Sequence, residues 1–154
     1  MLSGREYNMN FPYLQDKEAG MYSPLSLAYI GDAVYEIYVR SHVLENGNTA
    51  VNKLHKASTG YVSARAQSRV IKELASCLTE EETAVYKRGR NAHSNTSAKN
   101  ADIVDYRHAT GFEALLGYLF ISHNYERLNE IIKLSFNIID VTNYKENGGE
   151  SSNE

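Results

Sequence analysis

The feature that most constrains the fold is the stretch of residues 23–45, SPLSLAYIGDAVYEIYVRSHVLE, which has the pattern of one long helix. Ser23 is a suitable N-cap, and Pro24 fits the first helical position, where its missing N–H costs nothing. The apolar residues that we expect to face the core recur at helical spacing: Leu27, Ile30, Val34 and Ile37. An acid, Asp32, stands in the middle of this apolar run.

Asp32 is flanked by Ile30 and Val34, so we expect its carboxylate to be partly desolvated. Desolvation of a carboxylate costs free energy unless a cation, a proton or a hydrogen bond compensates. Glu36 shares a helix face with Asp32, but Arg40 follows it four residues later, in the order that favours an ion pair. We therefore interpret Glu36 as a salt-bridged surface residue and keep Asp32 as the functional candidate.

The rest of the chain also has helical patterns. We expect helices over residues 49–57, 61–78 and 102–122, and a last one over 125–139 after an N-cap at Asn124. Residues 58–60, Ser-Thr-Gly, are interpreted as a break. Thr79 and Glu82 have the spacing of a capping box and begin a further short helix. No strand-like alternation stands out, so the predicted fold class is all-α.

The chain divides into three parts by composition. Residues 1–16 are expected to form a loosely attached N-terminal arm, residues 17–141 one folded domain, and residues 142–154 a disordered polar tail. A chain of 154 residues has room for one domain of ordinary size. The apolar pairs at 115–116 and 119–120 add to more apolar surface than such a domain needs, which suggests a dimer.

The net charge of −3 conceals a basic middle segment. Residues 51–108 hold ten Lys or Arg against six Asp or Glu, which creates a local positive field. Lys87, Arg88 and Arg90 lead into a small, polar stretch, residues 90–101, that contains Lys99 and is expected to be a mobile loop. This loop could follow phosphates, whereas basic residues on a helix often form only a solvated face.

The remaining signals indicate a cytoplasmic protein. The single cysteine, Cys77, excludes an internal disulfide and fits a reducing compartment, and we expect it to be a buried apolar residue. The N-terminus lacks the layout of a signal peptide, and no apolar run approaches the roughly 20 residues of a membrane span. We expect no membrane contact.

A second acid, Glu113, has the same kind of setting as Asp32, because it lies in the apolar run GFEALLGYLF. If the two helices pack against each other, the two carboxylates could meet. Mg²⁺ takes such oxygen ligands together with waters, and Mn²⁺ is a plausible substitute. The alternative is that each acid is an ordinary salt-bridged or solvated residue, and spacing alone leaves both interpretations open.

At LAYIGDAVYEIYVR and FEALLGYLF the sequence resembles the catalytic domain of ribonuclease III, and most closely the short Mini-ribonuclease III family. Further blocks support this: LHKASTGYVSARAQ (54–67), EEETAVYKRGRNAHS (80–94) and KNADIVDYRHATGFEALLGYLF (99–120). The resemblance implies an all-helical bundle that forms a homodimer and cuts double-stranded RNA with Mg²⁺. It assigns Asp32 and Glu113 as catalytic and metal-binding residues.

Two of the acids found in larger ribonucleases III are missing, since Ala28 and Thr110 stand in their places. Fewer protein ligands imply that waters or RNA phosphates complete the coordination. The sequence also ends where the family's separate RNA-binding domain would begin, which favours the short family. The phosphate contacts are then expected from the basic residues of the catalytic domain: Lys87, Arg88, Arg90, Lys99 and Arg107.

The resemblance therefore predicts an endoribonuclease that matures the ends of precursor 23S ribosomal RNA. The products would carry a 5′-phosphate and a 3′-hydroxyl, and a ribosomal protein is a candidate further partner. The main alternative is a catalytically silent relative that only binds double-stranded RNA, because two acids are absent. A more distant alternative is a helical protein-interaction module whose acids are salt-bridged.

Overall fold

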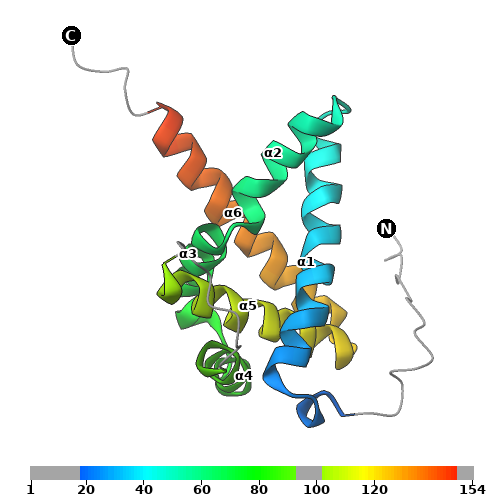
Figure 1. Ribbon diagram of the computed structural model, residues 1–154, viewed down its shortest axis with the longest axis vertical. Coiled ribbons are helices and arrows are strands. Elements are labelled where there is room, and N and C mark those ends of the chain that lie inside the picture. The colour runs from blue at the N-terminus through cyan, green and yellow to red at the C-terminus, as the bar shows by residue number, and fades with distance from the viewer. Residues whose placement is uncertain (1–17, 93–101, 149–154) are drawn as a thin grey trace, which may run out of the picture.

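The computed structural model describes residues 18–92 and 102–148, and every regular element within these ranges is a helix (Figure 1). The helices are η2 (Ala19–Met21), α1 (Pro24–Glu45), α2 (Val51–Val62), α3 (Ala64–Leu74), η3 (Ala75–Cys77), α4 (Glu80–Asn91), α5 (Ile103–Ile121) and α6 (Tyr125–Gly148). The predicted all-α class is confirmed. No helix in the described ranges is long and apolar enough to cross a membrane.

Helix α5 forms the centre of the bundle. In Figure 1 it crosses the lower middle of the molecule, with α1 upright beside one end, α4 below it and α6 passing diagonally. Residues 109–121 of α5 are buried or half-buried throughout, as expected of a helix that is apolar on all sides. Glu113 is the one charged residue in this stretch, so its carboxylate lies inside the bundle.

Local sequence signals begin α1, α4 and α6 where these helices were predicted to begin. The Ser23 hydroxyl accepts a hydrogen bond from the Ser26 N–H at 3.2 Å, and Pro24 occupies the first helical position of α1. Thr79 and Glu82 form the predicted capping box at the start of α4. Asn124 accepts the Arg127 N–H before α6. These caps satisfy N–H groups that have no partner inside the helix.

The buried face of α1 differs from the predicted one. Buried residues recur every four positions, as Leu27, Gly31, Tyr35, Val39 and Val43. The Tyr35 ring packs edge-on against Phe112 of α5, with ring centroids 5.3 Å apart. Ile37 lies two residues from Tyr35, on the other side of the helix, and is 60% exposed. The prediction that Ile37 faces the core was therefore wrong.

The predicted break at residues 58–60 was also misplaced. Helix α2 continues through these residues, and the hydroxyls of Ser58 and Thr59 donate to carbonyls one turn earlier in the same helix, so they do not compete for the N–H groups of the backbone. The chain turns instead at Ser63, whose side chain accepts the Ala66 N–H and so begins α3.

Two further predictions fail toward the ends of helices. Cys77 is exposed rather than buried, because α3 ends at Leu74 and the chain leaves the core through η3. Helix α6 extends to Gly148 and so includes residues that were assigned to the polar tail. An ion pair of 3.7 Å between Arg69 and Glu146 links this extension to α3. The predicted N-terminal arm and the last six residues lie outside the described ranges.

Candidate metal centre and basic face

Asp32 and Glu113 are brought together by a close contact between α1 and α5. A Cβ atom built on Gly31 would lie 1.8 Å from the Glu113 carbonyl oxygen, and one on Gly117 would lie 1.9 Å from the Leu27 carbonyl oxygen. Only glycine permits the two backbones to approach this closely. Asp32 directly follows Gly31, and its charge acts on the Glu113 carboxyl.

The electrostatics of the pair reflect this proximity. Burial and the neighbouring Asp32 charge raise the pKa of Glu113 to about 7, while a hydrogen bond from Gln67 partly opposes the shift. Burial, followed by the charge of Glu36, also raises the pKa of Asp32, although this residue is exposed. Both carboxylates are therefore disfavoured in their charged forms, and a cation between them would relieve the penalty.

The residues present fit a hard divalent cation that keeps most of its waters. Within residues 18–92 and 102–148, no group of three or more His, Cys, Asp or Glu side chains is arranged to hold a metal ion. Two carboxylates with waters or substrate phosphates are a common donor set for Mg²⁺. Glu36 contributes negative charge but is held in the predicted ion pair with Arg40, at 3.1 Å.

The two positions where larger ribonucleases III carry acids offer no additional charge. Ala28 is buried in the core, and the Thr110 hydroxyl donates to the Tyr106 carbonyl of its own helix at 3.0 Å. The pair Asp32 and Glu113 thus forms the acidic part of the site without help from these positions.

The predicted basic residues lie on different helices. Lys87 and Arg88 are exposed on α4, and Arg107 is exposed near the start of α5. The Arg90 guanidinium stands over the Tyr86 ring, 5.6 Å from its centroid. Lys99 and most of the predicted mobile loop fall outside the described residues.

Lys72 on α3 adds a cation near this set, although it is not among the predicted phosphate contacts. The Tyr86 hydroxyl is hydrogen-bonded to His108 Nδ1. Burial lowers the pKa of His108, and the charges of Lys72 and Arg90 lower it further. Lys72 of α3 and Arg90 of α4 therefore both lie close enough to His108 of α5 for their charges to act on it.

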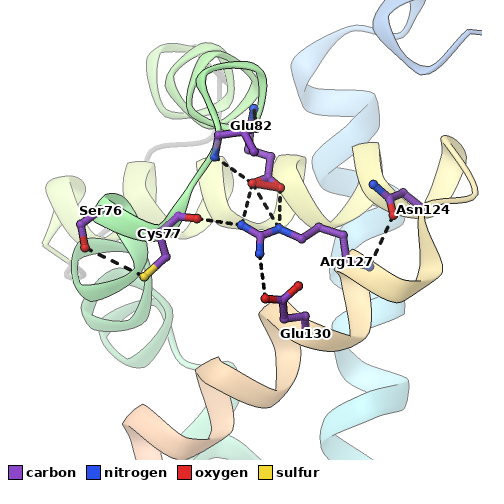
Figure 2. A network of polar contacts seen from close by, with 7 residues as sticks. Ser76, Cys77, Glu82, Asn124, Arg127 and Glu130 are labelled. Carbon is purple, nitrogen blue, oxygen red and sulfur yellow. Dashed lines mark hydrogen bonds and ion pairs between the residues drawn. The ribbon is translucent and has the colours of Figure 1, made fainter.

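A separate polar network holds α4 and α6 together (Figure 2). Arg127 of α6 binds Glu82 at 2.8 Å, Glu130 at 3.1 Å and the Cys77 carbonyl at 2.8 Å. The hydrogen bonds that Glu82 accepts from Arg127 and from Thr79 lower the pKa of Glu82, although burial opposes this shift. A hollow of about 590 Å³ borders this network, but its Tyr118 hydroxyl is already bound to Glu81. We interpret the network as structural.

Comparison with known proteins decides the family. The ribonuclease III domain family matches residues 25–124, well over half of the chain. The chain belongs to this family. Mini-ribonuclease 3 of Clostridium tetani is 54% identical over 133 residues, which cover 84% of this chain and 88% of that protein. Mini-ribonuclease 3 of Brevibacillus brevis is 52% identical over 124 residues, covering 80% and 92%.

A solved structure supports the same assignment. A protein of Fusobacterium nucleatum superposes with a TM-score of 0.69 at 29% identity, covering 79% of this chain and 97% of that one. The predicted resemblance to the Mini-ribonuclease III family and the bundle fold are therefore confirmed. As a ribonuclease III family member with Mini-ribonuclease 3 relatives, the chain is an endoribonuclease.

One residue near the acids was missed by sequence reasoning. Gln67 is buried beside Glu113, although no role was predicted for it. The sequence did contain an indication that Gln67 is buried, because it shares a helix face of α3 with the buried residues Val70, Ile71 and Leu74. A polar side chain on such an apolar face needs a specific partner.

Proposed function

We propose that this ribonuclease III family member is a Mg²⁺-dependent endoribonuclease that cuts double-stranded RNA. The observation that carries the proposal is the placement of Asp32 next to Glu113 by the glycine contact of α1 and α5. The products would carry a 5′-phosphate and a 3′-hydroxyl, as implied by the resemblance. Mn²⁺ would substitute for Mg²⁺, because it accepts the same oxygen ligands.

Asp32 and Glu113 are the residues that would hold the ion. Bound there, a divalent cation would supply Lewis-acid chemistry, activating water and stabilising charge on the phosphate oxygens. The protein contributes two fixed oxygen donors on helices whose backbones are in contact. Glu113 must give up its proton to act as a ligand, and its raised pKa means that this occurs near neutral pH.

The basic residues would bind the RNA backbone. The cations proposed for phosphate contact are Lys87, Arg88, Arg90, Lys99 and Arg107. A-form RNA is recognised mainly by shape, through phosphates and 2′-hydroxyls, so these contacts would position the duplex rather than select a sequence. Lys72 would add positive charge near His108, on which the charge of Arg90 also acts.

A homodimer would match the two strands of the duplex, with one Asp32–Glu113 site for each strand. The face of α1 that carries Tyr29 and Ile37 is apolar and exposed, and a second copy of the chain would cover it. The proposed substrate is precursor 23S ribosomal RNA in the cytoplasm, matured at its ends with a ribosomal protein as a candidate helper. This substrate rests on the family resemblance alone.

The substitution Asp32→Asn tests the catalytic role. It removes the charge at nearly constant shape, so cleavage of a perfect RNA duplex in Mg²⁺ should fall at least about a hundredfold, or roughly 2.7 kcal/mol in the barrier. Binding of the duplex in Ca²⁺ or EDTA should remain. Glu36→Gln on the same helix is the matched control and should retain cleavage.

The same assay separates the alternative function. A silent RNA-binding relative, which the non-acidic Ala28 and Thr110 favour, would bind the duplex without cutting it at any Mg²⁺ concentration. If Asp32→Asn cuts within tenfold of the unaltered protein, Asp32 has no catalytic role and the proposal fails.

A further inference from the structure

Gln67 occupies an unusual position for an amide side chain. It is only 2% exposed and lies on the face of α3 that packs into the core, next to Glu113 of α5. Its neighbours along this face are Val70, Ile71 and Leu74, which are buried and apolar. A core position of this kind is normally apolar, so the amide must be retained for the contacts that it makes.

The amide nitrogen of Gln67 connects two elements of the fold. It donates to the Val62 carbonyl at the end of α2, at 2.9 Å, and Gln67 also lies close enough to the Glu113 carboxyl to lower its pKa. A carbonyl can only accept, so the contact with Val62 identifies which end of the amide is the nitrogen. Gln67 therefore ties the junction of α2 and α3 to the acid of α5.

The amide oxygen of Gln67 is left without a partner. Gln67 Oε1 is buried and accepts no hydrogen bond within the described residues. Leaving a buried acceptor unsatisfied costs free energy, which favours a role in a state that supplies a donor. A water molecule at the neighbouring acidic site is a donor of the required kind.

We propose that Gln67 is a positioning residue that holds the Glu113 carboxylate in place for a divalent cation. The inference rests on the proposed function, because it takes Asp32 and Glu113 as the residues that bind the ion. With only two acids available, the orientation of each carboxylate matters more than in a site with four. A donor on α3 restricts the rotation of Glu113, and the unpaired amide oxygen can receive a hydrogen bond once a hydrated ion is present.

A purely structural role makes a different prediction. If Gln67 serves only to satisfy the Val62 carbonyl, its loss should reduce the thermal stability of the protein without changing its affinity for metal. The test must therefore measure metal binding itself, in the absence of RNA, alongside stability.

The decisive variant is Gln67→Leu, which keeps approximately the volume and removes both amide functions. We expect the Mn²⁺ dissociation constant, measured by calorimetry on the full chain without RNA, to rise about tenfold or more. Ser68→Ala is the matched control, because Ser68 is the adjacent residue, is 1% exposed and also has a hydroxyl without a partner. This control should bind Mn²⁺ as the unaltered protein does.

The outcomes separate the two proposals. If Asp32→Asn leaves Mn²⁺ binding unchanged, the metal site itself is wrong and the proposed function fails with it. If Asp32→Asn weakens binding but folded Gln67→Leu does not, only the role of Gln67 is overturned.

A measurement on the unaltered protein covers the case in which Gln67→Leu does not fold. The chain has two glutamines, Gln15 and Gln67, so selective labelling of glutamine identifies their two side-chain NH2 groups by NMR, and a uniformly labelled sample reports the backbone signals of Asp32 and Glu113. During a Mg²⁺ titration the Gln67 amide signal should shift with the same midpoint as the backbone signals of Asp32 and Glu113. A Gln67 signal that stays fixed while those backbone signals move would overturn the proposal.

Discussion

At the scale of single residues, Glu113 combines a functional position with an energetic penalty. Its carboxyl, carried by α5, is buried in the bundle and repelled by the charge of Asp32. Burial and this repulsion raise the pKa of Glu113 to about 7 from the ordinary 4.5. Between these two pH values the folded protein keeps a proton that the unfolded chain releases. The stability associated with that proton is therefore present below pH 4.5 and is lost as the pH rises through 7.

The substitution Glu113→Gln should remove this pH-dependent loss. We expect the metal-free variant to be more stable than the unaltered protein at pH 8, by on the order of 3 kcal/mol, and to lose this advantage near pH 4.5. Thermal unfolding in EDTA at both pH values measures the effect. Equal melting temperatures at pH 8 would contradict it.

The effect of added Mg²⁺ on thermal stability is a second test of Glu113→Gln. The unaltered protein should gain stability through binding of the ion, whereas Glu113→Gln should gain little. Glu113 is thus expected to lower the stability of the metal-free protein and to serve the binding of the ion.

At the scale of elements, the crossing of α1 and α5 decides whether the acids meet. Gly31 and Gly117 have ordinary negative φ angles, so these positions require glycine for space rather than for conformation. The close backbone contact replaces the side-chain layer that normally separates two helices.

A methyl group at Gly31 should therefore separate the helices. Gly31→Ala places a Cβ 1.8 Å from the Glu113 carbonyl oxygen, and backbone cannot yield as a flexible side chain can. We expect a destabilisation of about 3 kcal/mol or more and loss of RNA cleavage. Chemical denaturation and the duplex assay measure these effects.

Gly60→Ala in α2 is the control for this prediction. A Cβ at Gly60 meets no atom within 4 Å, and alanine favours a helix over glycine by about 1 kcal/mol. The control should be neutral or slightly stabilising and should cleave RNA normally. Gly31→Ala with unchanged stability and activity would show that the helices do not pack as described.

At the scale of the whole molecule, α1 leaves an apolar strip uncovered. Leu25, Tyr29, Ala33 and Ile37 follow one another at four-residue spacing and are exposed, Tyr29 at 83% and Ile37 at 60%. Asp32 lies beside this strip. A second copy packed on the strip would set two acidic sites at a fixed separation, which suits the two strands of one duplex.

The double substitution Tyr29→Asp with Ile37→Asp should therefore convert the proposed dimer to a monomer. Introducing two desolvated charges into an apolar interface opposes association. Light scattering after size-exclusion chromatography measures the mass. Tyr144→Asp on α6, at a residue that is 81% exposed, is the control and should leave the mass unchanged. A double variant that remains dimeric would place the interface elsewhere.

The sequence by itself determined the features that depend on near neighbours along the chain. Ser23, Thr79 and Asn124 cap helices because a side chain needs only the next turn as its partner. The Glu36–Arg40 pair follows from helical spacing in the same way. The motifs around Asp32 and Glu113 indicated the family, which the comparisons confirm.

The tertiary structure decided what depends on contacts between helices. It set which face of α1 is buried, so that Ile37 is outside, and it gave Gln67 a partner on another helix. It also brought Gly31 against α5, which neither helix specifies alone. Spacing fixes directions within one helix, but the distance between side chains on two helices depends on how closely their backbones approach.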